Sequence, residues 1–269
     1  MPLSIEGRPS EAQAIRTICG ALDGGIDFID TADVYCIDDG DIGHNERLIA
    51  KALDEWNGGH EVLVATKGGV RRPGGDWTHD GRRSHIRRAC EASLRALGTE
   101  RIGLDQLHAP DPRVPFEETL GALADLQREG KIEHLGLSNV GLDHLWRAQS
   151  LVPVVSVQNQ ANPYHPRGLK DGVLEACEVE GIAFIAYSPV GGWRAGRIAH
   201  EPLLQEIWQR HGSTPFQVVL AWLLAKSPNL IAIPGASRPE NALASVAALE
   251  LELQPSDLQR LDKEFLSVG

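Results

Sequence analysis

The chain has 269 residues, of which 42% are hydrophobic, and a formal net charge of −11 at pH 7. This length is ordinary for one α/β barrel and allows a large core, so we expect a single domain over residues 1–269. The negative charge argues against a nucleic-acid partner and against an anionic membrane surface, because both would need a basic face.

The cysteines and the N-terminus indicate the cell compartment. Cys19, Cys36, Cys90 and Cys177 have no paired spacing typical of a zinc site or a redox pair, which fits a reducing compartment. No apolar run approaches the roughly 20 residues of a membrane span, and the N-terminus lacks the features of a signal peptide. We therefore expect a soluble cytoplasmic protein. The pattern does not indicate its oligomeric state.

Helical and strand patterns alternate along the whole chain. Helical periodicity predicts helices at 9–22, 46–53, 82–97, 115–128, 142–148, 169–180, 202–211, 215–225, 239–249 and 255–265. Apolar, β-rich segments predict strands at 26–30, 61–67, 102–108, 130–137, 153–158, 182–187 and 230–233. Strands that alternate with helices and are apolar on both faces are typical of a parallel sheet with helical crossovers.

These strands favour the α/β class and a (β/α)8 TIM barrel, which an eighth strand would close. The only place for that strand is upstream of the first helix, at residues 1–5, so we expect the first strand to be short or truncated. A doubly wound open sheet is the competing architecture. It is disfavoured because no Gly-x-Gly-x-x-Gly follows any strand.

Polar side chains stand at or just after three of the strands: Asp30 with Tyr35, then Lys67, then His108. Because the carboxyl ends of barrel strands converge on one face, we expect these groups to reach one small molecule. A tyrosine with its ordinary pKa of about 10 is a poor acid at neutral pH, and an ammonium such as Lys67 would lower that pKa. Asp30 would hold Lys67 in place, and a neutral His108 would donate a hydrogen bond to a carbonyl oxygen. This arrangement lacks an electron source, so a cofactor must bring the hydride.

With these residues in place, the sequence resembles the aldo-keto reductases, of the bacterial type. The resemblance runs from about Arg8 to the last helix and rests on FIDTADVY with a following HNE, ATKGG, LDQLHAPDP, GKIEHLGLSN, VQNQAN, AYSP and AIPGAS. It implies that Asp30, Tyr35, Lys67 and His108 form the catalytic tetrad, with Tyr35 as the general acid in carbonyl reduction.

The resemblance also implies a nucleotide site at the later strand ends. The nicotinamide would contact Ser138, Asn139, Gln158 and Tyr187, the pyrophosphate would contact Ser188 and Pro189, and the adenosine 2′-phosphate would contact Gly235, Ala236, Ser237 and Arg238. A guanidinium can bind a phosphate through two donors, so Arg238 favours NADPH, with NADH as the alternative cofactor.

Two features depart from the family pattern. Ala244 and Ser245 stand where the family commonly has Glu-Asn against the adenine, so those contacts would be absent and Asn241 would take over part of the role. The glycine-containing first strand that normally floors the nicotinamide site is missing or shortened. Both features bear on cofactor binding.

Three functions follow as hypotheses. The first is an NADPH-dependent oxidoreductase that reduces a small aldehyde or ketone. The second is a nicotinamide-binding barrel with little turnover that acts as a redox-sensing or regulatory subunit, as the potassium-channel β subunits of the family do. The third is a metal-assisted hydrolase that uses His108 and Asp111, although the chain has no His-x-His pair there. Trp77 and Trp193 fall in loops near the barrel mouth, where they could line a substrate pocket or simply be exposed.

Overall fold

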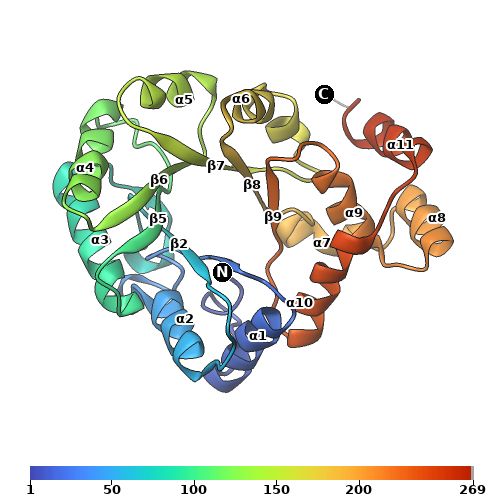
Figure 1. Cartoon of the computed structure of the whole chain (residues 1–269), viewed down its shortest axis with the longest axis horizontal. Coiled ribbons are helices and arrows are strands. Elements are labelled where there is room, and N and C mark those ends of the chain that lie inside the picture. The colour runs from blue at the N-terminus through green and yellow to red at the C-terminus, as the bar shows by residue number, and fades with distance from the viewer. Residues whose placement is uncertain (268–269) are drawn as a thin grey trace. The chain divides into compact units, whose positions relative to one another are not determined.

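The computed structural model describes residues 1–267, in which strands alternate with helices (Figure 1). Seven strands form one sheet in the order β1 (Phe28–Asp30), β2 (Leu63–Gly68), β5 (Ile102–Leu107), β6 (Ile132–Ser138), β7 (Val154–Gln160), β8 (Ala183–Tyr187) and β9 (Leu230–Ile233). Each of the strands predicted from the sequence is present. The prediction of the first one was too long, since only its last three residues are a strand.

The helices follow the predicted periodicity. They are α1 (Glu11–Asp23), α2 (His44–Glu55), α3 (Arg83–Leu97), α4 (Phe116–Arg128), α5 (Leu142–Gln149), α6 (Val173–Glu180), α7 (Ala195–Ile198), α8 (Pro202–His211), α9 (Pro215–Leu224), α10 (Pro239–Val246) and α11 (Pro255–Phe265). The sequence did not reveal α7, because four residues are too few to show a period. Within residues 1–267, no helix combines the length and the apolar character that crossing a membrane requires.

The helix predicted over 169–180 is divided in the structure. A short 3-10 helix (Pro166–Leu169) comes first, and α6 begins only after Gly172, which has a φ of 84°. A left-handed φ interrupts a helix, and glycine accepts it without a steric cost. The helix predicted over 239–249 likewise ends at Val246 and continues as a 3-10 helix, Ala247–Glu250.

The chain consists of two compact units. The first is Met1–Ser156 with Gly235–Ala242, and the second is Val157–Pro234 with the segment that begins at Leu243. The first unit contains β1, β2, β5 and β6 with α1 to α5, and the second contains β8 and β9 with α6 to α9. The expectation of one domain over residues 1–269 stays a prediction.

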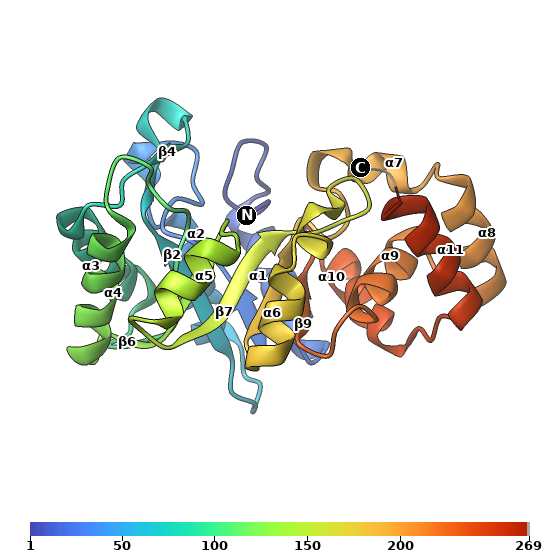
Figure 2. The same ribbon diagram turned by 90° about the horizontal axis from the view of Figure 1, so that it is seen from above.

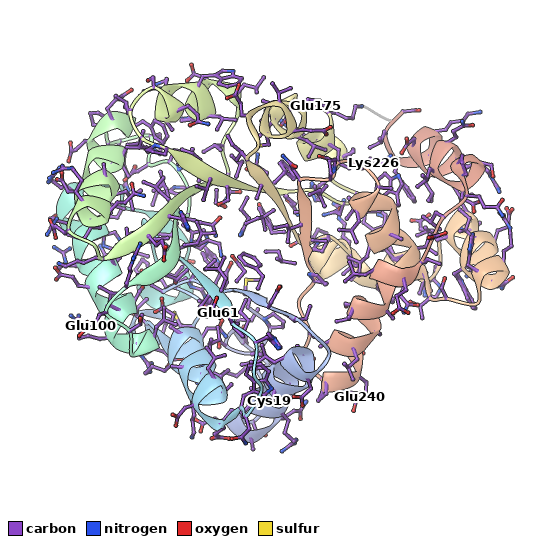
Figure 3. All side chains as sticks on the ribbon, in the orientation of Figure 1. Cys19, Glu61, Glu100, Glu175, Lys226 and Glu240 are labelled. Carbon is purple, nitrogen blue, oxygen red and sulfur yellow. The ribbon has the colours of Figure 1, made fainter. Side chains whose placement is uncertain are left out.

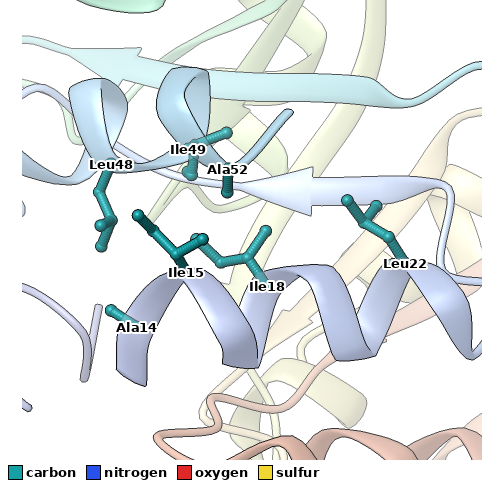
Figure 4. Packing of buried hydrophobic residues seen from close by; sticks show 7 residues of the cluster. All are labelled: Ala14, Ile15, Ile18, Leu22, Leu48, Ile49 and Ala52. Atoms are coloured by element: carbon teal, nitrogen blue, oxygen red, sulfur yellow. The ribbon is translucent and has the colours of Figure 1, made fainter. Parts of the chain in front are cut away.

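The packing of α1 on α2 shows how the first unit acquires its core. Ser10 caps α1 by accepting a hydrogen bond from the backbone of Gln13, and the apolar residues that follow recur every three or four positions. The cluster they form consists of Ala14, Ile15, Ile18 and Leu22 of α1 with Leu48, Ile49 and Ala52 of α2 (Figure 4). Cys19, labelled in Figure 3, adds a thiol contact of 3.7 Å to the carbonyl of Ala52. This layer holds β1 and β2 from one side.

Residues 1–8 form turns in place of the expected first strand. The backbone amide of Ser4 donates to the carbonyl of Met1, and the backbone amide of Arg8 donates to the carbonyl of Ile5. The donor–acceptor distance is 3.0 Å in both bonds. Side chains anchor the segment: the Ser4 hydroxyl lies 2.8 Å from both the Asn45 amide and the His44 Nδ1. Local turns and side-chain bonds thus satisfy groups that a strand would pair with a neighbour.

A small antiparallel hairpin, β3 (Val70–Arg71) with β4 (Thr78–His79), was also missed by the sequence analysis. In Figure 2 this segment extends beyond the ends of α2 and α3. Two-residue strands carry no readable alternation, so the sequence indicated only a loop here.

Candidate active site

The first unit brings Asp30, Tyr35, Lys67 and His108 into one place. Asp30 ends β1, Lys67 lies in β2, and His108 directly follows β5. Tyr35 belongs to the loop after β1. The parallel register pairs Asp30 with Ala65 and Lys67 with Gln106, so these strand ends lie at nearly the same level of the sheet.

Lys67 and Asp30 form a buried ion pair. The Lys67 ammonium donates to both carboxylate oxygens of Asp30, at 2.8 and 2.7 Å, and to the carbonyl of Thr31 at 2.6 Å. The side chains are 0% and 7% exposed. Burial alone would lower the pKa of Lys67, but the charge of Asp30 and the contact with Tyr35 outweigh it and hold that pKa above its ordinary value. The lysine therefore stays charged at neutral pH.

Tyr35 is buried beside both the cation and the histidine. Its ring centroid lies 4.9 Å from the Lys67 ammonium and 5.9 Å from the His108 ring, which meets it edge-on at 82°. Only 9% of Tyr35 is exposed. An ammonium this close to a buried phenol favours the phenolate electrostatically.

His108 is neutral in this setting. Burial is the main reason that its pKa lies well below the ordinary value, and the charges of Lys67 and His79 act in the same direction. Its Nδ1 is buried without a hydrogen-bond partner among residues 1–267. A buried N–H without an acceptor costs more than an unused lone pair, which favours the tautomer with hydrogen on Nε2. That tautomer can donate a hydrogen bond to a ligand.

The backbone is strained at two residues of the expected nucleotide site. Asn139 has a φ of 58° and Ser188 a φ of 49°, and no other non-glycine residue in the described part of the chain has a positive φ. The Asn139 amide donates to the carbonyl of His108 at 2.9 Å and to the hydroxyl of Ser138 at 3.1 Å. In the second unit, Asn162 donates to the carbonyl of Ser188 at 3.0 Å. Such strain persists where surrounding bonds enforce it, and it gathers at functional sites.

The other residues of the second unit that are expected to contact the nucleotide lie in β7, at the end of β8 and directly after β8. Gln158 lies in β7 and is 1% exposed, and Tyr187 is the last residue of β8. Burial raises the pKa of Tyr187, so its hydroxyl stays protonated. Pro189 follows Ser188 directly.

The segment after β9 belongs to the first unit and leads into α10. Gln13 of α1 donates to the carbonyl of Ser237 at 2.9 Å, and a Cβ on Gly235 would lie 3.0 Å from the Pro2 ring. Ala236 is half-buried, whereas Arg238 and Asn241 are exposed. Arg238 forms no ion pair with residues 1–267. Its guanidinium is therefore available for an anion.

The Met1 amino group lies within electrostatic range of the ion pair. Burial lowers the pKa of the Met1 amino group to about 5, while the charge of Asp30 raises it and that of Lys67 lowers it. The first residues of the chain thus lie close to the groups that end β1 and β2.

Trp77 lies at the site, whereas the sequence left its role open. It belongs to the hairpin loop, and its ring centroid is 6.0 Å from the His108 ring. The Arg72 guanidinium stacks 4.2 Å from the Trp77 ring and donates to the carbonyl of Ile37 at 2.8 Å. About half of Trp77 (49%) is exposed, so it presents an aromatic face beside the imidazole. Trp193, in the second unit, is 84% exposed and stacks only with Arg194 among the described residues.

Gln106 also belongs to the site, and the sequence analysis overlooked it. It is fully buried, and its amide nitrogen lies 3.3 Å from Oδ1 of Asp30. No sequence pattern marked it, because its role depends on the register that pairs it with Lys67 and Gly136.

Asp111 has a structural role in the loop after β5. It accepts hydrogen bonds from the Gly81 backbone at 3.1 Å and from Arg113 at 2.9 Å. These bonds hold the pKa of Asp111 far below its ordinary value, and the side-chain bond from Arg113 has the largest effect. The carboxylate fixes the loop, and nothing in this geometry favours the hydrolase hypothesis.

Comparison with known proteins identifies relatives of the whole chain. The profile of the Aldo/keto reductase family matches residues 2–264. An uncharacterized oxidoreductase of Schizosaccharomyces pombe is 35% identical over 259 residues, which are 95% of this chain and 80% of that protein.

Among solved structures, a thermostable aldo-keto reductase in complex with the inhibitor epalrestat has a TM-score of 0.81 and 32% identity, over 94% of this chain and 88% of that one. An aldo-keto reductase from Klebsiella pneumoniae in complex with NADPH has a TM-score of 0.78 and 26% identity, over 95% and 85% of the two chains. The fold class is thus the (β/α)8 barrel of these structures, with seven strands in the main sheet of residues 1–267.

Proposed function

Because the chain belongs to the aldo/keto reductase family and is an oxidoreductase, we propose that it reduces an aldehyde or ketone, with NADPH as the hydride source and Tyr35 as the proton donor. The observation that carries this proposal is the buried Lys67 ammonium, which is paired with Asp30 and lies 4.9 Å from the Tyr35 ring. The pair keeps a positive charge beside a phenol that would otherwise be a poor acid at neutral pH.

Each residue of the site has one task in the reduction. His108, neutral and with hydrogen on Nε2, donates a hydrogen bond that orients the substrate carbonyl oxygen. Tyr35 transfers its proton to that oxygen, and Lys67 stabilises the phenolate that remains. In the direction of alcohol oxidation, the Tyr35 phenolate accepts the proton instead.

The side chains expected to contact the nucleotide, taken one by one, match the groups of an amide-bearing, anionic cofactor. Ser138, Asn139 and Gln158 offer a hydroxyl and amides, which match a carboxamide group, and Tyr187 offers an aromatic face. Arg238 is exposed and without an ion-pair partner in residues 1–267, which suits a phosphate. The aldo-keto reductase of Klebsiella pneumoniae that was solved with NADPH supports the same choice of cofactor.

The test separates the reductase from the redox-sensing alternative. The protein is titrated with NADPH and with NADH by fluorescence, and turnover is then measured on a panel of small aldehydes and ketones. The proposal predicts tighter binding of NADPH and steady consumption of it with at least one carbonyl class. Tight binding with negligible turnover across the panel would favour the sensor, and no binding of either nucleotide would refute both.

A further inference from the structure

Buried polar side chains form a layer beside the proposed catalytic residues, at the level of Lys67 in the sheet. The strand register pairs Lys67 with Gln106 and Gln106 with Gly136. Ser156 of β7 completes the layer, because its hydroxyl lies 3.5 Å from the side-chain oxygen of Gln106. Gln106 is 0% exposed and Ser156 is 1% exposed. These groups therefore have no access to water, and each must be satisfied within the layer.

The hydrogen bonds of this layer all donate toward Asp30, from Ser156 to Gln106 and from Gln106 to the carboxylate. An ionised carboxylate can only accept, so the Gln106 amide must turn its NH2 group toward Oδ1 of Asp30, at 3.3 Å. Its oxygen then faces Ser156, whose hydroxyl donates. The same Asp30 oxygen accepts from Lys67 at 2.8 Å. Gln106 thus bonds the carboxylate that holds the lysine.

Gly136 provides the space that this arrangement needs. A Cβ built on Gly136 would lie 2.2 Å from the Ser156 hydroxyl and 2.9 Å from Cγ of Gln106. Both distances are far too short for any side chain, and both side chains are enclosed. A glycine at this position of β6 is what allows Gln106 and Ser156 to meet across it.

We propose that Gln106 is a positioning residue for the proposed reaction: it fixes the Asp30 carboxylate so that both of its oxygens accept from Lys67, and Ser156 fixes Gln106 in turn. The proposal rests on the proposed function. Without Gln106, Asp30 can rotate about its side-chain bonds, and the Lys67 ammonium loses the alignment that places it against Tyr35. A small displacement of such a group has a large effect on a proton-transfer step.

Other charges act on Lys67, and the test must leave them unchanged. They are Asp30 at the end of β1, Asp33 and Tyr35 in the loop after it, Glu46 of α2, Asp105 of β5, His108 after β5, and the Met1 amino group. Replacement of Gln106 by methionine removes the hydrogen bonds, keeps a similar volume and introduces no charge. Ser156→Ala is the milder companion, because it removes only the hydroxyl behind Gln106.

The experiment measures two properties of each variant. Nitrogen-detected NMR follows the titration of the Lys67 ammonium in the protein without nucleotide, and steady-state kinetics with NADPH and an aldehyde follows turnover. Gln106→Met should lower the Lys67 titration midpoint by about one pH unit and reduce kcat by about tenfold or more, because a hydrogen bond to a charged group is lost. The Kd for NADPH should stay the same. Ser156→Ala should move both readouts in the same direction by less.

Asn229→Leu serves as the matched control. It removes an amide of the second unit that bonds the backbone carbonyls of Cys177 and Ile182, each at 3.3 Å. It should lower the melting temperature without moving the Lys67 midpoint. If both Gln106→Met and Ser156→Ala fold and leave the midpoint and kcat at native values, the positioning role is refuted. If the native protein lacks turnover while the midpoint still responds to Gln106, the proposed function fails and the positioning of the ion pair stands.

Discussion

The Lys67 ammonium lies 2.8 and 2.7 Å from the two carboxylate oxygens of Asp30, with both side chains almost completely enclosed. A buried ion pair of this kind is poor evidence of stability, because removing two ions from water costs about as much as their attraction returns. Its retention in the core is better explained by the charge that it presents to Tyr35.

Removal of the lysine tests the role of the ion pair. Lys67→Met should abolish turnover and lower the free energy of unfolding by roughly 3–5 kcal/mol, because it leaves the Asp30 charge buried and uncompensated. The double variant Asp30→Asn with Lys67→Met should recover most of that stability and none of the turnover. Chemical denaturation and an aldehyde reduction assay measure the two effects. Recovery of turnover in the double variant would show that the pair is only structural.

Asp105 predicts a pH dependence of stability. Burial, with the neighbouring Glu46 charge, raises the pKa of this carboxyl from 3.8 to about 8. The folded protein therefore holds a proton that the unfolded chain releases between these two values, so the contribution of Asp105 to stability is lost as the pH rises through that window. Asp105→Asn places a neutral side chain at this position at every pH. The free energy of unfolding of the variant, compared with that of the native protein at the same pH, should therefore increase from pH 6 to pH 9.

Asp257 in the second unit is the matched control for Asp105. Burial alone would raise its pKa, but His211 and Arg210 outweigh burial and lower it. The contribution of Asp257 to folding stability is therefore present when the pH is above the ordinary pKa of the carboxyl group, and it is lost as the pH falls through the lowered pKa. Asp257→Asn should destabilise the protein at both pH 6 and pH 9, because the carboxylate keeps its bond to Arg210 at both. Denaturant titrations at both pH values test both carboxyls, and equal effects of pH on the two variants would contradict the assignment of Asp105.

Trp77 predicts a preference among substrates. Its exposed face lies beside His108 and is held by Arg72. Trp77→Ala should raise KM for aromatic aldehydes by roughly 2- to 10-fold, the contribution of one aromatic contact, and change KM for small aliphatic aldehydes less. Trp193→Ala, which removes an exposed tryptophan of the second unit, is the control and should leave both values unchanged. A uniform change for all substrates would place Trp77 outside the substrate pocket.

Arg238 predicts the choice between nucleotides. Arg238→Ala should weaken NADPH binding by about tenfold or more, since a charge-assisted contact to the 2′-phosphate is lost, and should leave NADH binding unchanged. Arg16→Ala, at an exposed position of α1, controls for a general loss of positive charge. Equal weakening of both nucleotides would assign Arg238 a role other than binding the phosphate.

The strands and their polar ends were predictable because each strand shows two signals in the sequence. One is a run of apolar residues, and the other is a polar or charged residue at the end of that run. Lys67 closes a run of apolar residues, and a charged residue in that position must find a partner or a function. The same reasoning placed Asp30 and His108. Long helices such as α3 show three or more turns of apolar periodicity, which sequence patterns reveal well.

Other parts of the site depend on tertiary contacts that no pattern displays. Gln106 looks like an ordinary polar interruption of β5 until the register sets it beside Lys67 and opposite Gly136. The hairpin that carries Trp77 has strands of two residues, and Arg72 of its loop stacks on Trp77 and bonds the carbonyl of Ile37, contacts that no propensity displays. The N-terminal turn replaces a strand because Ser4 bonds the side chains of His44 and Asn45.

The most direct test of the central claim is the turnover of Tyr35→Phe with NADPH and a carbonyl substrate of the native protein. The substitution removes one hydroxyl and keeps the ring that packs against His108 and Lys67. The account predicts that turnover is abolished while the Kd for NADPH and the melting temperature stay close to native values. Turnover at the native rate in this variant would show that the proton comes from another group and would contradict the mechanism.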